Sequence, residues 1–179
     1  MRLHDLPPGF DDPVEALLGF HRRIERNLAT LGRIAFHLEA RGVDAEGSAM
    51  AASVLDFFTG ALVLHHADEE DLLPMLEMRL ATNGQGDSMR EMRVRLEAEH
   101  REMDRTWRTL RRPLEGIAEG INRVVPVDLL QYYRALQATH ISIEESGIHL
   151  AAARCLLPAD RAALGRGMVA RRTRKLRFA

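Results

Sequence analysis

Residues 65–73 read His-His-Ala-Asp-Glu-Glu-Asp-Leu-Leu, and residues 140–148 read His-Ile-Ser-Ile-Glu-Glu-Ser-Gly-Ile. Both stretches share one pattern: a histidine, three residues, two glutamates, two residues and then an apolar residue. In an α-helix, residues four positions apart lie on one face. The repeat therefore predicts two helices that each present an imidazole and a carboxylate on one face, close enough to bind one ion or to bridge two.

The first stretch contains two candidate pairs, and the repeat distinguishes them. It selects His65 and Glu69, which continue a run of apolar residues in steps of three and four through Leu72. That spacing is typical of a buried helix face. His66 and Glu70 lie about 100° away around the helix, so we keep them only as additional candidate ligands.

Glycines, prolines and capping residues divide the chain into four long helical patterns and a shorter basic one. The predicted limits are about 12 to 41, 44–48 to 82, 87 to 112, 126–128 to 157, and 159 to 175. We expect Pro113 to end the third helix because proline lacks a backbone N–H and clashes with the preceding turn, which leaves 113–125 as a connection. The patterns predict an all-α, antiparallel up-down four-helix bundle with a short C-terminal fifth helix. It forms one domain, with the bundle over about 12–157 and the basic segment over 159–179.

Each of the four long helices carries one histidine on its apolar face, which we call its seam, and two of these seams also carry a glutamate. These six residues are His21, His65, Glu69, His100, His140 and Glu144. Counted at about 1.5 Å per residue from the helix ends, they fall in one layer of an antiparallel bundle. Buried imidazoles and carboxylates need partners. With no inward thiolate, the set suits iron, manganese or zinc, and two bridging glutamates suit a pair of ions.

The remaining histidines are predicted to lie on the surface. His37 comes 16 residues after His21, and His149 nine residues after His140, which turns both away from the seams. His4 belongs to the same group. The basic residues near the C-terminus are predicted to form a solvated tail: Arg171, Arg172, Arg174, Lys175 and Arg177.

Composition limits the partners and the compartment. The 179 residues are 46% hydrophobic and 28% charged, as in one compact soluble domain. The 25 Lys plus Arg nearly balance 26 Asp plus Glu, so we expect no nucleic acid or anionic membrane as the main partner. Charges interrupt the apolar stretches before the roughly 20 residues that a membrane span needs. The single cysteine, Cys155, and an N-terminus without a signal-like apolar run favour the cytoplasm.

These motifs resemble the hemerythrin-like, HHE cation-binding domains over about residues 12–157. The resemblance rests on His21, the His65–Glu69 pair followed by Leu73-Pro74, Glu99-His100, and the His140–Glu144 pair. It implies a non-heme di-iron centre with two bridging carboxylates and terminal histidines. The implied ligands are the six seam residues, and the implied cofactors are two iron ions, with manganese or zinc in a recombinant preparation.

One position departs from the oxygen-carrying members of that family. They place a second histidine one turn after the third-helix histidine, where this chain has Asp104. One iron is then short of an imidazole, which argues against simple reversible oxygen carriage. The candidates for the missing ligand are His66, Glu70, Glu25, Asp104 or a water molecule.

The sequence leaves three candidate functions. We favour a binding protein whose open iron site takes oxygen or nitric oxide, for sensing, scavenging or iron and oxidative-stress handling, because a histidine-rich ligand set stabilises diferrous iron. The alternative is a di-iron oxidase or peroxidase-like enzyme. A metal-free interaction bundle would leave a layer of buried polar groups uncompensated. The expected assembly is a monomer or a homodimer.

Overall fold

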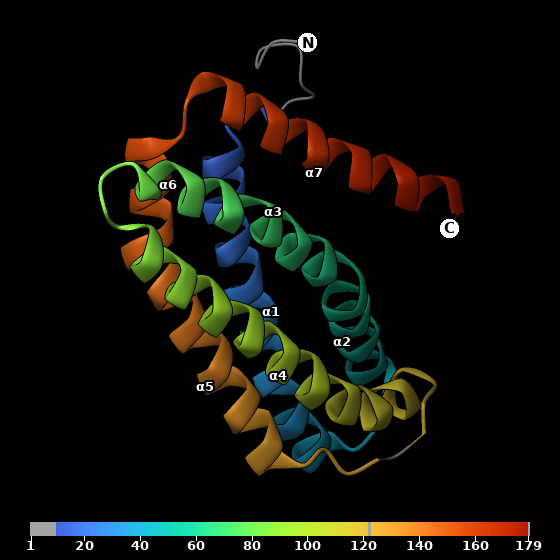
Figure 1. Cartoon of the computed structure of the whole chain (residues 1–179). Coiled ribbons are helices and arrows are strands. Elements are labelled where there is room, and N and C mark those ends of the chain that lie inside the picture. The colour runs from blue at the N-terminus through green and yellow to red at the C-terminus, as the bar shows by residue number, and fades with distance from the viewer. Residues whose placement is uncertain (1–9, 122, 179) are drawn as a thin grey trace. The chain divides into compact units, whose positions relative to one another are not determined.

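The computed structural model describes residues 10–121 and 123–178, and their side chains as far as residue 174. Its elements are α1 (Pro13–Arg41), α2 (Ala45–Asp56), the π-helix η2 (Phe57–Ala61), α3 (Leu62–Ala81), α4 (Gly86–Ala118), α5 (Val127–Ile143), the π-helix η3 (Glu144–Ile148), α6 (His149–Cys155) and α7 (Pro158–Phe178) (Figure 1). The described residues include no strand, so the chain is all-α, as predicted. Each π-helix joins its neighbours without a break, since its flanking residues keep right-handed helical dihedrals.

Acidic residues cap α1 and α2 at the predicted starts of these two helices, whereas α4 begins at Gly86, one residue before its predicted start. Asp12 accepts hydrogen bonds from the backbone N–H groups of Val14 and Glu15 at the start of α1. Asp44 accepts one from Gly47 at the start of α2. These bonds satisfy N–H groups that have no partner inside the helix. The first two helical limits are therefore predictable from local chemistry.

Pro113 does not end its helix, and that prediction is wrong. α4 continues through it to Ala118. A proline inside a helix costs about 3 kcal/mol, but the added turns bury Leu114 and Ile117 completely. Burying two such side chains contributes about 1.5–3 kcal/mol each, which offsets that cost. The connection to α5 is shorter than predicted and includes Gly120, whose φ of 79° favours glycine.

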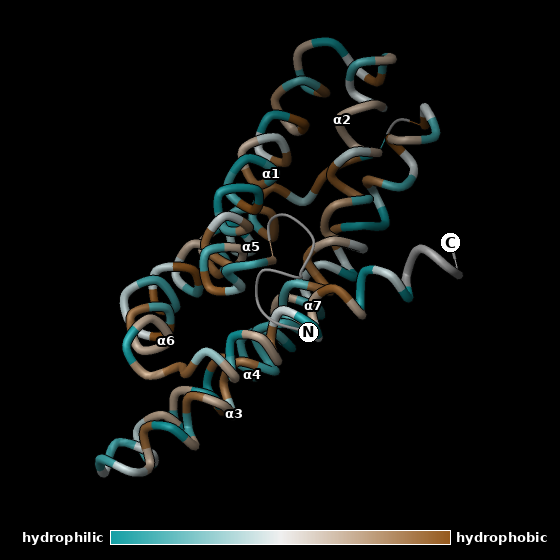
Figure 2. Tube along the Cα trace, turned by 90° about the horizontal axis from the view of Figure 1, so that it is seen from above, coloured by the Kyte–Doolittle hydropathy of each residue, from teal (hydrophilic) through white to brown (hydrophobic). Residues whose placement is uncertain are grey.

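The chain divides into two compact units, and α1, α3, α4 and α5 each contribute residues to both, whereas α7 belongs to unit 1. Unit 1 consists of the described parts of Met1–His21, Leu64–Ala98 and Ile141–Ala179. Unit 2 consists of those of Arg22–Val63 and Glu99–His140. Along the helices, hydrophobic and hydrophilic positions alternate, as the brown and teal segments of Figure 2 show. Each unit is thus a small helical bundle built around its own apolar positions.

The two cores differ in composition. The unit 1 core is mainly aliphatic and includes Leu17, Leu72, Leu76, Leu96, Ile148 and Leu164. The unit 2 core contains an aromatic group, in which the Phe58 ring lies 4.9 Å from that of Trp107 and 5.6 Å from that of Tyr133. Large rings in contact exclude water effectively. Polar side chains placed beside either core are removed from solvent.

The C-terminal helix α7 packs onto α3 within unit 1 (red in Figure 1). Near one end, Arg79 of α3 donates two hydrogen bonds of 2.8 Å to Asp160 of α7. Near the other, Arg171 donates to Asp68, so the two helices run antiparallel. The prediction of a solvated basic tail is therefore wrong for Arg171 and Arg172, which are half-buried, although Arg174 is exposed. Lys175 and Arg177 lie outside the side chains that the structure describes.

One helical stretch, Ala45–Ala81, is long and apolar enough to cross a membrane by length and composition alone. This corrects the expectation that charges interrupt every such stretch. Its inward residues are buried in the protein cores, with Phe58 in unit 2 and Leu72 in unit 1. A core helix of a soluble protein passes the same test, so the stretch is weak evidence for a membrane.

Candidate metal centre

Unit 1 contains a buried cluster of two imidazoles and two carboxylates. Its members are His21 of α1, His65 and Glu69 of α3, and Glu144 at the start of η3. Each offers one ligand atom, and these four atoms lie within 4.8 Å of one another. Each residue is about 1% exposed. We call this group the unit 1 cluster.

The contacts inside the unit 1 cluster are short. His65 Nε2 lies 2.7 Å from Glu69 Oε1 on the next turn of α3. His21 Nε2 lies 3.2 Å from Glu144 Oε2 and 3.5 Å from Glu69 Oε1. One imidazole nitrogen thus faces a carboxylate from each of two helices, which is the donor set that zinc, iron and manganese accept.

Neighbouring side chains orient the imidazoles. The Phe20 ring stacks on that of His65 with centroids 4.3 Å apart. On the outer side of His21, Nδ1 donates a hydrogen bond to Glu145 Oε1 over 3.1 Å. A carboxylate that accepts from Nδ1 fixes the tautomer and leaves Nε2 available for a metal ion. Glu145 is therefore suited to a supporting role rather than to ligation.

Two buried carboxylates require a balancing positive charge. Burial lowers the pKa of His21, but its hydrogen bonds to Glu144 and Glu69, and their charges, outweigh this and raise the pKa to about 10. A proton on His21 supplies the positive charge at neutral pH. A metal ion held by the same four side chains would supply it instead and displace that proton. The unit 1 cluster thus fits a divalent cation in both donor type and charge.

Unit 2 contains the other two seam histidines. His100 of α4 and His140 of α5 are buried, and their Nε2 atoms lie 3.0 Å apart. His140 Nδ1 donates to Glu99 Oε2 over 2.8 Å. Two imidazole nitrogens bound to one ion at about 2.1 Å would lie about 3 Å apart at a right angle. The His100–His140 pair has the spacing of two such ligands.

All six predicted ligands are buried, four in the unit 1 cluster and two in the His100–His140 pair. The additional candidates lie elsewhere. His66 is half-buried, whereas Glu70 and Glu25 are exposed. Asp104 is also exposed and pairs with Arg108, so it does not replace the missing third-helix imidazole.

The prediction that His149 lies on the surface is wrong. Its side chain is buried, with 3% exposed, and its ring stacks 5.0 Å from that of His21. Burial and the charge of His21 lower the pKa of His149 to about 4, so it is neutral at neutral pH. A straight α-helix would turn residue 149 away, but η3 inserts a wider turn before it.

The surface prediction also fails in part for His37, which is half-buried and bonds Asp44 over 2.7 Å. His37 therefore joins the end of α1 to the cap of α2. His4 lies outside the described residues. Apart from the predicted start of a helix near Asp44, the sequence gives no sign of the hydrogen bond between His37 and Asp44.

Asp68 is a buried charge that sequence reasoning missed. It is 0% exposed and precedes Glu69 on α3. Arg171 Nη1 and Arg172 Nη2 each lie 2.7 Å from one of its carboxylate oxygens. Burial raises the pKa of Asp68 despite both arginines. The part of α3 that carries His65 and Glu69 is thus linked by charge to α7. In the sequence, only the basic character of residues 171–172 indicated such a link.

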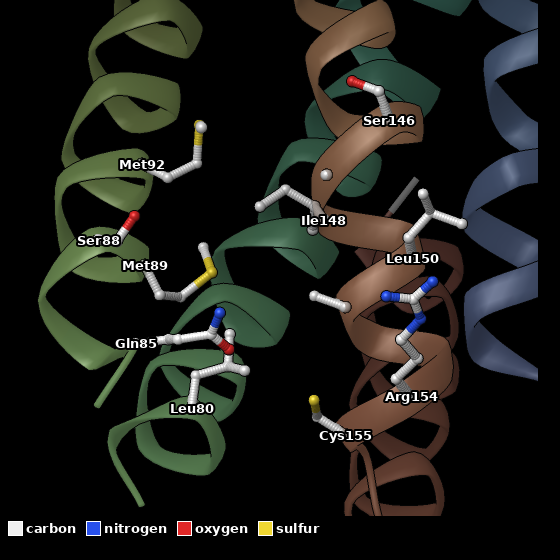
Figure 3. A pocket seen from close by; sticks show the side chains of 12 residues that line it. Leu80, Gln85, Ser88, Met89, Met92, Ser146, Ile148, Leu150, Arg154 and Cys155 are labelled. Carbon is white, nitrogen blue, oxygen red and sulfur yellow. The ribbon is translucent and has the colours of Figure 1, made fainter. Parts of the chain in front are cut away.

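Unit 1 also has an open pocket of about 420 Å³. Figure 3 shows Met89 and Met92 of α4 on one side and Ile148 and Cys155 on the other. The pocket shares η3 with the unit 1 cluster, but its lining does not include Glu144 or any other described member of that cluster. It is a separate and mainly apolar surface.

Two comparisons show which known proteins the chain is similar to. Residues 12–152 match the sequence profile described as "Hemerythrin HHE cation binding domain". An uncharacterized protein of Haemophilus influenzae is 27% identical over 164 residues, which cover 91% of each chain. The match to the family profile spans every seam histidine and both seam glutamates.

Proposed function

Because the chain belongs to the hemerythrin HHE cation-binding family, we propose that this metal-binding protein holds two iron ions and binds oxygen or nitric oxide at an open iron site. The role that follows is sensing, scavenging, or iron and oxidative-stress handling. The observation that carries the proposal is the unit 1 cluster, in which buried imidazoles and carboxylates converge within 4.8 Å. Buried carboxylates in an apolar core need a balancing positive charge, and a metal ion held by these four side chains supplies it in place of the proton on His21.

The proposed ligands are the six seam residues, His21, His65, Glu69, His100, His140 and Glu144. Two arguments support this set. The spacing of His140 and Glu144 repeats that of His65 and Glu69, and membership of the family implies two carboxylates that bridge a pair of ions. When bound, iron supplies an open coordination position for a small ligand.

The chain's own residues prepare the site for that ligand. Glu145 accepts from His21 Nδ1, and Glu99 accepts from His140 Nδ1. These bonds hold the rings in orientation and increase the basicity of Nε2. Burial of the imidazoles excludes bulk water, which strengthens the electrostatic interactions of any bound group. The single free Cys155 is consistent with the proposed cytoplasmic location.

The histidine content favours ligand binding over oxidation, since anionic ligands stabilise ferric iron more than imidazoles do. The exposed position of Asp104 supports a second candidate, a peroxidase-like activity, because an iron short of one imidazole has room for peroxide. The two functions differ in the fate of the ligand: a binding protein releases it unchanged.

Metal analysis with spectroscopy tests the proposal. Protein loaded anaerobically with Fe²⁺ should retain about two ions per chain and melt at a lower temperature after chelation, since an ion that binds only the folded state stabilises it. Absorption spectra before and after addition of oxygen or nitric oxide should show an adduct. Retention of one ion or none, with unchanged melting, would contradict the dinuclear proposal. Size-exclusion chromatography distinguishes a monomer from a homodimer.

A further inference from the structure

Among the described residues of unit 1, His149 is the one buried histidine outside the proposed ligand set. Neither of its ring nitrogens has a hydrogen-bond partner among the described residues. A neutral imidazole offers one donor and one acceptor, and burying both without partners is unfavourable. The position therefore calls for a polar partner that residues 10–121 and 123–174 do not provide.

The π-helix explains why the ring lies here. The backbone N–H of His149 donates to the carbonyl of Glu144, five residues earlier. Five residues of α-helix would carry the chain about 140° past a full turn, whereas the wider π turn returns it to roughly the same face. His149 therefore follows Glu144 on the inward side. π-Helical turns inside α-helices occur frequently at functional sites.

The distance from the unit 1 cluster suits an indirect contact. The ring of His149 lies 5.0 Å from that of His21. Its nitrogens are not among the atoms that lie within 4.8 Å of one another in the unit 1 cluster, so the ring is too far to share an ion with all four residues. A diatomic molecule bound to that ion would extend about 2–3 Å beyond it, which brings its outer atom within hydrogen-bond range of such a ring.

We propose that His149 donates a hydrogen bond to the small ligand bound at the ion of the unit 1 cluster. The ligand class is a diatomic molecule or small anion with an acceptor atom, such as nitric oxide, oxygen or azide. The inference rests on the proposed function and adds a positioning residue to it. The ring nitrogen holds the ligand, and the metal ligands remain those of the unit 1 cluster and the His100–His140 pair.

Nitric oxide is the probe for the test, because its N–O stretching frequency responds to a hydrogen bond. We compare diferrous wild type with His149→Phe, which keeps an aromatic ring without a donor, and with His149→Gln, which keeps a donor. His149→Phe should retain full metal content, raise the N–O stretching frequency, abolish its shift in D₂O, and raise the nitric oxide dissociation constant about three- to tenfold. His149→Gln should restore part of each effect. His37→Phe, a half-buried histidine of unit 2, is the matched control and should resemble wild type.

The outcomes separate the inference from the proposed function. If His149→Phe keeps its metal, its N–O frequency and its affinity for nitric oxide, the inference is refuted while the metal site stands. If His149→Phe and His149→Gln fold by circular dichroism but lose metal, His149 holds the ion itself, which also overturns the inference. A wild-type protein that binds no metal refutes both. If His149→Phe does not fold, the N–O stretching frequency of His149→Gln decides. A D₂O shift of this frequency equal to that of wild type supports a hydrogen bond donated by residue 149, and loss of the shift refutes the inference.

Discussion

Removing the arginines that face Asp68 should destabilise the protein strongly. In the variant Arg171→Ala/Arg172→Ala, the carboxylate of Asp68 remains fully buried without its two cations. Removing the partner of a buried charge costs about 3–5 kcal/mol. The two arginines are 23% and 25% exposed, so water already weakens the pairing. We therefore expect the lower end, about 3 kcal/mol, which corresponds to a fall in melting temperature of about 6–12 °C for a domain of this size.

The loss should depend on pH with a defined sign. Burial already raises the pKa of Asp68, and removal of the arginines raises it further. A group whose pKa is higher in the folded state stabilises the fold below its unfolded pKa and loses that contribution as pH rises through its folded pKa. The melting temperature of the variant should therefore fall further below that of wild type at pH 8 than at pH 5.

Thermal melts followed by circular dichroism at both pH values measure the effect. Arg174→Ala removes an exposed cation from the same helix and is the matched control. Asp68→Asn in the arginine-free background should recover part of the stability at pH 8, because it removes the uncompensated charge. A double variant that melts within 2 °C of wild type at pH 8 would refute the reasoning, since Asp68 would then have another source of compensation.

Three further predictions concern the metal site and α4. Binding of Zn²⁺ to the metal-free protein at pH 7 should release about one proton from His21, whose pKa is about 10. Calorimetry in two buffers of different ionisation enthalpy measures the number of protons released, and a binding enthalpy that is the same in both buffers would contradict the prediction. His65→Ala should abolish binding of at least one ion by elemental analysis, whereas His66→Ala and Asp104→Ala should retain both; loss of metal in either of the latter would show that the predicted register is incorrect. Pro113→Ala should raise the midpoint of urea unfolding by an amount equivalent to about 1–2 kcal/mol, since it restores a helical N–H and removes a clash, and an unchanged midpoint would show that α4 is already relaxed there.

The apolar seams of the sequence predict the long helices and four of the buried histidines. Periodicity identifies His21, His65, His100 and His140 because each interrupts a run of apolar residues at helical spacing. It could not identify His149, since periodicity assumes 3.6 residues per turn and η3 departs from it. The π-helical hydrogen bond between residues five positions apart has no signature in the amino-acid composition.

Long-range packing explains the other differences. Pro113 is a local signal for a helix end, but α4 continues past it because the added turns bury Leu114 and Ile117 completely. Arg171 pairs with Asp68 across 103 positions, and no local pattern encodes such a pairing. The hemerythrin HHE resemblance identified the family correctly.

The antiparallel pairing of α3 and α7 has a consequence for biogenesis. Arg79 and Asp68 of α3 meet Asp160 and Arg171 of α7, which follow them in the chain by 81 and 103 positions. Until α7 has been synthesised, Asp68 lacks these arginine partners, and burial of its carboxylate is unfavourable. Contacts this distant in sequence form late in folding. Unit 1 therefore reaches its full stability only after α7 has been synthesised and has docked on α3, which makes α7 a late-forming part of that unit.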